Sequence, residues 1–354
     1  MPTPDHDPTA IAALNAVAHA LEIDQTRAAR HADNGYTWWI APGLRQRVSV
    51  ETRTPHGTRC LRIETPIWHH ADPDAIAPLL EALCQHARGA AVLHAPESGI
   101  VSLVSRVPLP ASATAARARA LAGTGAIQAF LAAWAWGEAR TQLAERAAPW
   151  RDALPHPELG MDVSPDPVLT YRDRVLRPGA SERDGAFADA LLSATTNAIE
   201  RSGLGLMPQR HTDDGPIAFA VDVGPTLGYL EVGLINGAVD ARSLGVVLTV
   251  PGHLIEARAQ ACGFELLLRQ LAPDATDWVL GSWAPVPRRD GRPGFGINHG
   301  LFLPLALAPA DIGPEIAAAA ARTVETVRVW FEDGAPAPVA VPVNATETGR
   351  RVVA

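Results

Sequence analysis

The stretch that decides the fold is Ile100–Pro110, which reads Ile-Val-Ser-Leu-Val-Ser-Arg-Val-Pro-Leu-Pro. Its apolar residues fall largely on one parity, so it predicts a mostly buried strand that ends at a proline. A similar stretch, Leu-Phe-Leu-Pro-Leu-Ala-Leu-Ala-Pro, occupies residues 301–309. A segment with a broad apolar helical face follows each of the two stretches. We therefore expect one kind of domain that occurs twice in the chain.

The composition is that of a globular protein large enough for two cores. The chain has 354 residues, of which 47% are hydrophobic and 19% charged, and domains average roughly 150 residues. Its net charge of −8 and the lack of a basic run argue against binding to nucleic acid. All 30 basic residues are arginine, which removes the lysine of a P-loop and Schiff-base chemistry.

The cysteines and the apolar runs predict a cytoplasmic protein without membrane segments. Cys60, Cys84 and Cys262 have neither metal nor disulfide spacing, and an odd number of cysteines fits a reducing compartment. The first residues lack the basic and apolar regions of a signal peptide. No apolar run approaches the roughly 20 residues that span a bilayer.

Hydrophobic periodicity predicts an α-β-β-β-α-β-β-α order within residues 1–147. A helix begins near Pro8, and turns at Asn34-Gly35, Pro42-Gly43 and Pro55–Gly57 separate three strands. A second helix begins after Asp72-Pro73, a hairpin follows, and a third helix closes the domain. The three strands are expected at 36–41, 46–52 and 59–65, the hairpin at 90–95 and 100–107, and the helices at about 8–21, 72–88 and 124–147.

The same order recurs in residues 184–333, after a proline-rich linker at 148–183. Strands are expected at 217–223, 228–235, 244–250, 277–283 and 294–307, with a possible extra strand at 204–210. Helices are expected from Asp184, after Pro251-Gly252 and from Pro314. The middle helix should bury Leu254, Ala257, Ala261, Phe264, Leu268 and Leu271. Residues 334–354 are expected to form a disordered tail.

This order of elements resembles the type III secretion chaperone and YbjN-like superfamily. The resemblance implies an α+β fold in two tandem copies, each an antiparallel sheet packed against helices, and hence a covalent pseudo-dimer. Members of that superfamily are small homodimers that hold segments of client proteins or act as adaptors, and they offer no catalytic residues. The features that carry the resemblance are Tyr36–Ile40, Val48 with Val50, Leu61 with Ile63, Ile76–Cys84, Ile100–Pro110 and Ile127–Trp136.

Candidate metal or catalytic residues favour ordinary structural roles. Trp68–Asp74 contains His69, His70 and two aspartates, but adjacent histidines diverge in any regular element. We therefore expect a loop with an N-cap aspartate rather than a metal site. His253 and His299 are possible general bases, yet no nucleophile motif accompanies them. No cofactor is predicted.

Tryptophans and arginines are the candidates for binding a protein partner. Trp38 and Trp39 point to opposite sheet faces, and Trp134 and Trp136 lie about 200° apart on a helix. One residue of each pair should be buried, and the other exposed or covered by other parts of the chain or by a partner. Arg288, Arg289 and Arg292 cluster at a hairpin tip, where they are either a solvated loop or a contact for an acidic partner.

These patterns favour a non-enzymatic, chaperone-like or adaptor protein that binds a segment of a protein partner. It would be a monomeric pseudo-dimer or a homodimer. The alternatives are an enzyme or small-ligand sensor with a cleft between the copies, using His253, His299 or the 69–74 cluster, and a structural subunit of a larger complex.

Overall fold

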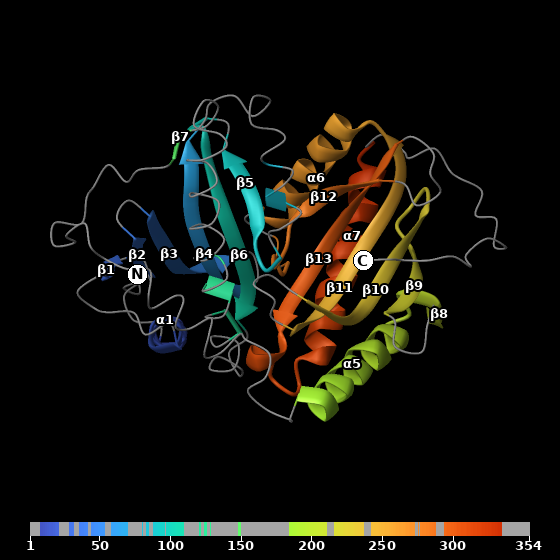
Figure 1. Cartoon of the computed structure of the whole chain (residues 1–354), viewed down its shortest axis with the longest axis horizontal. Helices are drawn as coiled ribbons and strands as arrows, with labels where there is room; N and C mark the ends of the chain where they lie inside the picture. Colours follow the sequence, from blue (N-terminus) through green and yellow to red (C-terminus); the bar gives the residue numbers. More distant parts are fainter. Residues whose placement is uncertain are drawn as a thin grey trace, which may run out of the picture.

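The computed structural model describes most of the strands and four α-helices of the chain. The described residues are 8–20, 28–31, 35–41, 44–53, 58–69, 80, 83–84, 88–95, 97–109, 120–121, 124–125, 128, 148–149, 184–210, 216–236, 242–272, 275, 277–287 and 294–334. They form two antiparallel sheets that stand side by side, sheet A from the N-terminal half and sheet B from the C-terminal half (Figure 1). The fold is therefore mixed α+β.

Sheet A has seven strands, in the order β1-β2-β3-β4-β6-β5, with the short β7 pairing against β4. The last two strands form a hairpin, and β6 inserts between β4 and β5. The strands are β1 (Ala28–His31), β2 (Gly35–Ala41), β3 (Leu44–Arg53), β4 (Thr58–His69), β5 (Ala91–Ala95), β6 (Ile100–Leu109) and β7 (Ala148–Pro149).

Sheet B has six strands, which read β8-β9-β10-β11-β13-β12 from one edge to the other. Its order therefore repeats that of sheet A: a four-strand meander, then the second strand of the closing hairpin, then the first. The strands are β8 (Gly205–Arg210), β9 (Ile217–Asp222), β10 (Leu227–Asn236), β11 (Arg242–Leu254), β12 (Trp283–Pro287) and β13 (Phe295–Pro304).

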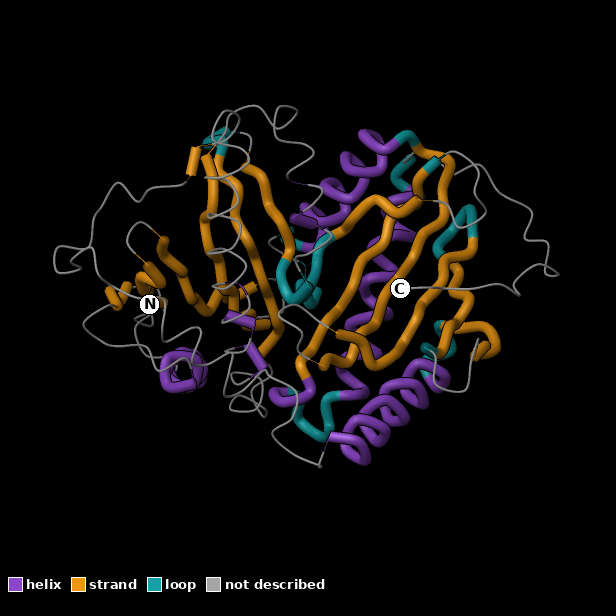
Figure 2. The backbone as a smooth tube through the Cα atoms, in the orientation of Figure 1, coloured by secondary structure: helices purple, strands orange, loops and turns teal. Residues whose placement is uncertain are grey.

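Helices cover one face of sheet B. The helix α7 (Gly313–Glu332) runs behind the strands of sheet B in Figures 1 and 2, whereas α6 (Glu256–Gln270) lies at the top of the view and α5 (Asp184–Arg201) along its lower side. Both α5 and α6 contact α7, and a short 3-10 helix, η5 (Leu305–Leu307), leads into α7. The helix α1 (Pro8–Ala20) packs against β3 of sheet A. In the part of the chain between β6 and β7, the described residues 120–121, 124–125 and 128 are also helical.

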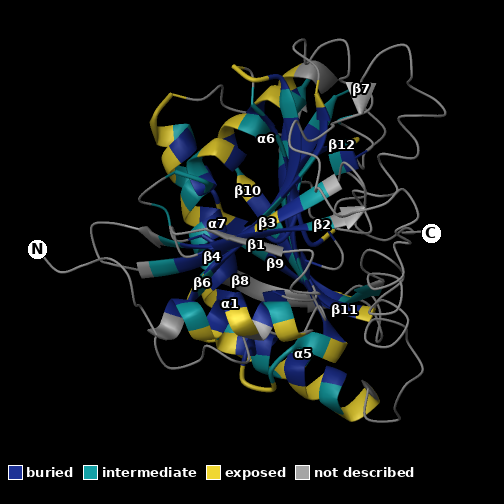
Figure 3. Cartoon of the chain, turned by 90° about the vertical axis from the view of Figure 1, so that its left-hand side faces the viewer, coloured by how far each residue is buried: buried dark blue, intermediate teal, exposed yellow. Residues whose placement is uncertain are grey.

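Strict alternation explains which face of each strand is buried. Leu244, Val246, Leu248 and Val250 of β11 point into the core, and Leu230 and Val232 of β10 pair with them on the same face. Residue pairs on one face of an antiparallel sheet are direct packing neighbours. Exposed positions accordingly gather on the helices, whereas the strands between them are mostly buried (Figure 3).

The sequence prediction is confirmed for helices α1, α5 and α7, for the hairpin of sheet A and for the second strand of the sheet B hairpin, whose first strand is β12 at 283–287. It missed β1, whose short Ala-Ala-Arg-His sequence has no β-branched or aromatic residue. The first sheet therefore begins with four meander strands rather than three. Most of the expected helices at 72–88 and 124–147, and most of the linker, lie outside the described residues; of the linker, Ala148–Pro149 form β7.

Two strands run further than expected. The strand β4 continues through Pro66 to His69 with a register shift between Pro66 and Trp68, so Trp68 and His69 are strand residues, not loop residues. The strand β11 continues through Pro251-Gly252 to Leu254, with a bulge after Val250. His253 therefore lies in a strand and not at a helix start. In both places a register shift next to a proline lets the strand continue.

The buried face of α6 differs from the expected one. Leu268 is 46% exposed and Ala261 is exposed, although both belong to the predicted apolar stripe. The helix instead buries Ala259, Cys262, Gly263, Leu266, Leu267 and Gln270. Three consecutive leucines at 266–268 fit two different helical stripes, and the sequence alone does not choose between them.

A buried chain of polar side chains runs through the core of sheet A. Trp38 Nε1 donates to Gln46 Oε1 at 3.0 Å, and Gln46 Nε2 donates to Thr65 Oγ1 at 3.0 Å. The Thr65 hydroxyl donates to Gln128 Oε1 at 3.0 Å, and Gln128 Nε2 reaches Ser105 Oγ at 2.6 Å. Each of these side chains is buried. A fully paired network of this kind fixes one arrangement of the core, because each unpaired member would be costly.

Candidate functional site

The two sheets are joined through main-chain hydrogen bonds. Arg106 N donates to Val279 O at 3.0 Å, and Val279 N donates to Arg106 O at 2.8 Å. Nearby, Gly89 N donates to Leu280 O at 2.8 Å and Val92 N to Ser282 Oγ at 2.7 Å. We call this contact, between residues 88–92 and 106 on one side and 270–282 on the other, the junction. Residues 277–282 therefore leave sheet B and complete the edge of β6, so the strand expected at 277–283 is wrong for all but its last residue.

A fully buried arginine lies at the centre of the junction. The Arg106 side chain has 0% exposure, and its guanidinium donates to Asp277 O at 3.4 Å, to Ala272 O at 3.5 Å and to Gln270 O at closer range. Gln270 is the last residue of α6, so Arg106 caps the carbonyl end of that helix from the neighbouring sheet. A cation at this end also interacts favourably with the helix dipole.

The Asp277 carboxyl is the acidic neighbour of Arg106. Burial raises its pKa above the ordinary aspartate value, and the Arg106 and Arg322 guanidiniums lower it by a smaller amount. Among the described residues, no hydrogen-bond donor reaches Asp277 Oδ1. The arrangement is a desolvated charge cluster without solvent access, which suits a structural lock better than a binding site.

His299 belongs to the same buried layer of sheet B. Its ring lies 4.8 Å from that of Trp283, whose Nε1 donates to Gln270 Oε1 at 2.9 Å. Burial lowers the pKa of His299 to about 3, against the opposing effect of a hydrogen bond with the Gly281 backbone. With 1% exposure, His299 has no route to a substrate. The residue is a neutral core histidine in this fold, not a general base.

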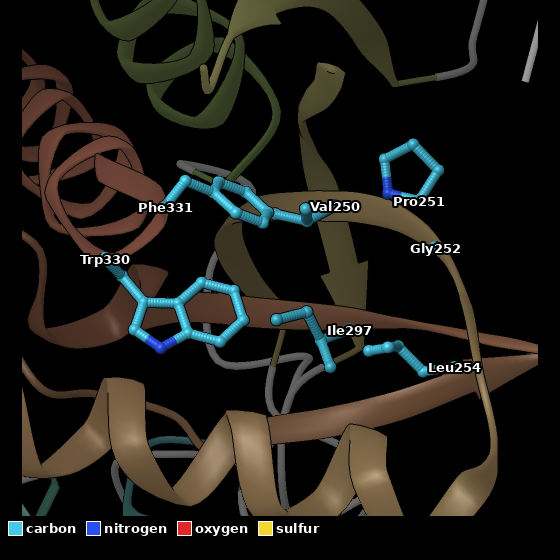
Figure 4. A pocket seen from close by; sticks show the side chains of 7 residues that line it. All are labelled: Val250, Pro251, Gly252, Leu254, Ile297, Trp330 and Phe331. Atoms are coloured by element: carbon cyan, nitrogen blue, oxygen red, sulfur yellow. The ribbon is translucent and has the colours of Figure 1, made fainter. Parts of the chain in front are cut away.

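An apolar pocket lies at the far end of sheet B, between the bulge of β11 and the last turn of α7 (Figure 4). It is a shallow depression, because the roughly 220 Å³ of empty space at this place includes open solvent. Gly296 lies under the bulge, where an added Cβ would be 2.6 Å from the Val250 carbonyl oxygen. The lining residues are Val250, Pro251, Gly252, Leu254, Ile297, Trp330 and Phe331.

Ile255 is the most exposed large apolar residue that the structure describes. It follows the pocket residue Leu254 and is 73% exposed. It is also the N-cap of α6, with no side-chain hydrogen bond to the helix. Ser, Thr, Asp or Asn at this position would stabilise the helix by about 0.5–2 kcal/mol relative to an apolar residue. Ile255 is therefore an apolar residue that is exposed to solvent and that occupies a position where a capping side chain is favoured. Departures of this kind from local preference are expected at functional sites.

Further apolar side chains adjoin the same end of the sheet. Leu227 begins β10, two residues before Tyr229, whose partner in β11 is Thr249, and Leu227 is 39% exposed. Phe331 is half-buried and packs against the β9–β10 turn at Gly224. We call the surface formed by Leu227, Pro251, Leu254, Ile255 and Phe331 the end patch.

The residues expected to bind a partner are placed as follows. Trp38 is buried and belongs to the polar network of sheet A, so it presents no surface to a partner. Trp39, on the opposite face, is half-buried. Trp134, Trp136, Arg288, Arg289 and Arg292 lie outside the described residues, as do His70–Asp74. Ile255 was not among the predicted partner-binding residues, because the expected helix begins after Pro251-Gly252 and places Ile255 inside it.

Within the described ranges, no group of three or more histidine, cysteine, aspartate or glutamate side chains could hold a metal ion. No described helix combines the length and apolar character needed to cross a bilayer. No protein-family model, curated protein or solved structure matches the chain. The class of the protein therefore follows from the fold and the end patch: it is an α+β protein of two sheet–helix units with an apolar surface at one end.

Proposed function

We propose that this protein is a tandem duplication that acts without catalysis, as a chaperone-like or adaptor protein binding an apolar segment of a protein partner. The observation that carries the binding proposal is the end patch, and above all the exposed Ile255, which follows the pocket residue Leu254. The resemblance of the sequence to the type III secretion chaperone and YbjN-like superfamily points the same way.

The strand order supports the duplication. Each sheet is a four-strand meander whose fourth strand pairs with the second strand of a hairpin. A helix precedes each meander, α1 before β1 and α5 before β8. The helix α6 separates β11 from β12, and the described residues 80 and 83–84 are helical at the corresponding place between β4 and β5.

The junction supports a pseudo-two-fold relation between the units. Arg106, two residues before Pro108 in β6, contacts the carbonyl end of α6. Phe302, two residues before Pro304 in β13, has the Arg88 guanidinium carbon 5.7 Å from its ring centroid. In each unit, the residue two positions before the proline of the last hairpin strand therefore contacts a segment that precedes the hairpin of the other unit. Isologous contacts of this kind are those of a two-fold dimer.

The geometry gives less support to the enzyme or sensor alternative. Pockets for small ligands usually enclose about 300–1,000 Å³ and combine apolar walls with a few convergent polar groups. The pocket at the β11 bulge is shallow and open to solvent, and its lining side chains carry one polar atom, the Trp330 Nε1, which already donates to Glu265 at 3.0 Å. The buried titratable groups at the junction, His299 and Asp277, do not line it.

The proposal is tested by replacing Ile255 with aspartate. Ile255→Asp adds a charge to the end patch and a good N-cap to α6, so the variant should lose binding while its Tm stays constant or rises. The assay is suppression of the aggregation of reduced α-lactalbumin, an unfolded client with exposed apolar segments, followed by light scattering. Leu268→Asp is the matched control, because Leu268 is an exposed apolar residue of the same size that lies near the other end of α6.

We expect the wild type and the Leu268→Asp variant to slow aggregation at equimolar ratio, and the Ile255→Asp variant to lose most of this effect. Equal suppression by all three chains would show that the end patch does not bind clients. No suppression by any chain, together with a rise in Tm in the presence of a metabolite, would replace the proposal with the ligand-sensor alternative.

A further inference from the structure

We infer that the outer face of sheet B, the face turned away from the helices, is a docking surface for a second copy of this chain. Two copies pack sheet against sheet about a two-fold axis that runs parallel to β11. This contact between copies is independent of the client binding proposed for the end patch.

The register of sheet B defines the outer face. Leu244, Val246 and Leu248 of β11 point into the core, so the residues between them point the other way. Cross-strand partners share a face, and in Figure 1 no described helix covers β10, β11 and β13 from the front. The larger side chains of the outer face on these strands are those of Tyr229, Glu231, Ile235, Val247, Thr249 and Phe302. Within residues 229–235, 243–249 and 298–304, Glu231 is the only charged residue on this face.

The equivalent face of sheet A is charged. Pro108 of β6 and Pro304 of β13 occupy the same place in the two sheets, and the strand registers extend this equivalence to the neighbouring strands. Read from sheet A to sheet B, the replacements are Arg62 to Gly245, Glu64 to Val247 and Glu51 to Ile235. A sheet face that meets water carries polar and charged residues, as sheet A does here. Their replacement by apolar residues and glycine in sheet B indicates a face that another apolar surface covers.

Two apolar side chains make the outer face of sheet B flat. A side chain at Gly245 would collide with Ile235, and one at Gly300 would collide with Phe302. Ile235 and Phe302 therefore lie across these glycines instead of standing away from the sheet. Two sheets pack face to face about 10 Å apart, with their strands aligned within about 30°. A second copy of the same flat face has the shape that such packing requires.

Charge complementarity selects the orientation of the two copies. Glu231, Val247 and Gly300 lie in one row across β10, β11 and β13. The Phe302 ring covers Gly300, and the Arg88 guanidinium carbon lies 5.7 Å from the centroid of that ring. A two-fold axis parallel to β11 and above Val247 places Glu231 of each copy over Phe302 and Arg88 of the other, so opposite charges meet twice. An axis along the row would instead bring the two Glu231 side chains together.

The size of the face predicts a reversible dimer. Four strands about 4.8 Å apart and about seven residues of about 3.4 Å each give a face of roughly 19 by 24 Å. Two such faces bury on the order of 1,000 Å², which is near the lower limit of specific interfaces. We therefore expect monomers at low micromolar concentration and dimers at about 100 µM and above.

Sedimentation velocity of the full-length chain between about 5 and 200 µM tests this dimer, because association follows mass action. The wild type should shift from monomer to dimer mass, and Val247→Arg should stay monomeric because it buries an unpaired charge at the centre of the contact. Val329→Arg is the matched control, since Val329 is 38% exposed on α7, behind the sheet, and this variant should dimerise like the wild type. A wild type that stays monomeric throughout, or equal dimerisation of the two variants, would overturn the inference.

Exchange of the two charges gives a result that misfolding cannot imitate. Glu231→Arg places an arginine against Arg88, and Arg88→Glu places a glutamate against Glu231, so each variant alone should dimerise about tenfold more weakly. A one-to-one mixture should recover the wild-type affinity within about threefold, because each contact of the mixed dimer again joins opposite charges. A mixture as weak as its separate components would refute the two-fold placement. Ile255→Asp should dimerise like the wild type, so the failure of the dimer leaves the end patch standing, and the reverse.

Discussion

At the scale of single residues, Arg106 has the clearest energetic role. Its guanidinium satisfies carbonyls at the end of α6 while its own main chain holds Val279. Arg106→Met should keep the packing of the side chain but leave these carbonyls and Asp277 without their partner, at a cost of about 3–5 kcal/mol in the free energy of unfolding. Denaturant titration followed by circular dichroism measures the change.

The neighbouring strand supplies a control for this prediction. Arg62 lies directly opposite Arg106 in the β4–β6 register and forms ion pairs with Glu64 at 2.8 Å and Glu51 at 3.6 Å at a partly exposed position. Arg62→Met should cost at most about 1 kcal/mol. Equal losses for the two variants would mean that the junction is not the reason for burying Arg106.

His299 predicts a dependence of stability on pH. Because burial lowers its folded-state pKa to about 3 from an ordinary value of 6.5, the unfolded chain binds the proton more tightly. The contribution of His299 is therefore lost as pH falls below about 6.5, by up to about 1.4 kcal/mol per pH unit. Asp277, with a raised pKa, acts in the opposite direction, favouring the folded state as pH falls.

The measurement is the unfolding free energy of the wild type and of His299→Asn between pH 7 and pH 4. Asparagine retains a donor for the Gly281 backbone but does not titrate, so the variant should lose the steep part of the acid dependence whatever its stability at pH 7. Parallel pH profiles for the two chains would show that His299 is not the group responsible.

At the scale of elements, the alternation of apolar residues predicted strands more reliably than helical periodicity predicted the buried face of a helix. Most strands of the meanders were predictable because large apolar residues recur at every second position, as in Ile217–Asp222, where alanines separate Ile217, Phe219 and Val221. The orientation of α6 was not, since its consecutive leucines fit two stripes. The path of residues 277–282 could not be predicted from the sequence either, because these residues pair with the β6 edge of the other unit at Arg106. The end patch was missed for a related reason: apolar residues were assigned to cores.

The corrected orientation of α6 gives a sharp comparison between neighbouring leucines. Leu267 is buried, whereas Leu268 is 46% exposed. Leu267→Ala should lower the free energy of unfolding by about 2–5 kcal/mol through the lost contacts and the cavity, and Leu268→Ala should change it by no more than about 0.5 kcal/mol. Thermal or urea denaturation of the two variants measures both losses. A larger loss for Leu268→Ala than for Leu267→Ala would support the buried face expected from the sequence.

At the scale of the whole molecule, the junction predicts that the two units stay together without a continuous chain. If the backbone is interrupted between residues 150 and 183 by coexpressing the halves as separate chains, they should copurify as one complex of the original mass. Size-exclusion chromatography and native mass spectrometry give the result. Val279→Pro removes one main-chain donor of the junction and should weaken the complex at least tenfold; halves that separate at micromolar concentration even with Val279 intact would refute the prediction.

The edge strand β12 has a consequence for how molecules of this protein meet one another. Its sequence is Trp-Ala-Pro-Val-Pro, and only β13 pairs with it among the described strands. Pro285 and Pro287 occupy alternate positions, those whose main-chain donors would face away from β13, and neither has an N–H to donate. An incoming strand would therefore find two of the main-chain donors of this edge missing. The edge is a poor template for growth into a polymer, because the missing donors are a property of the proline residues themselves.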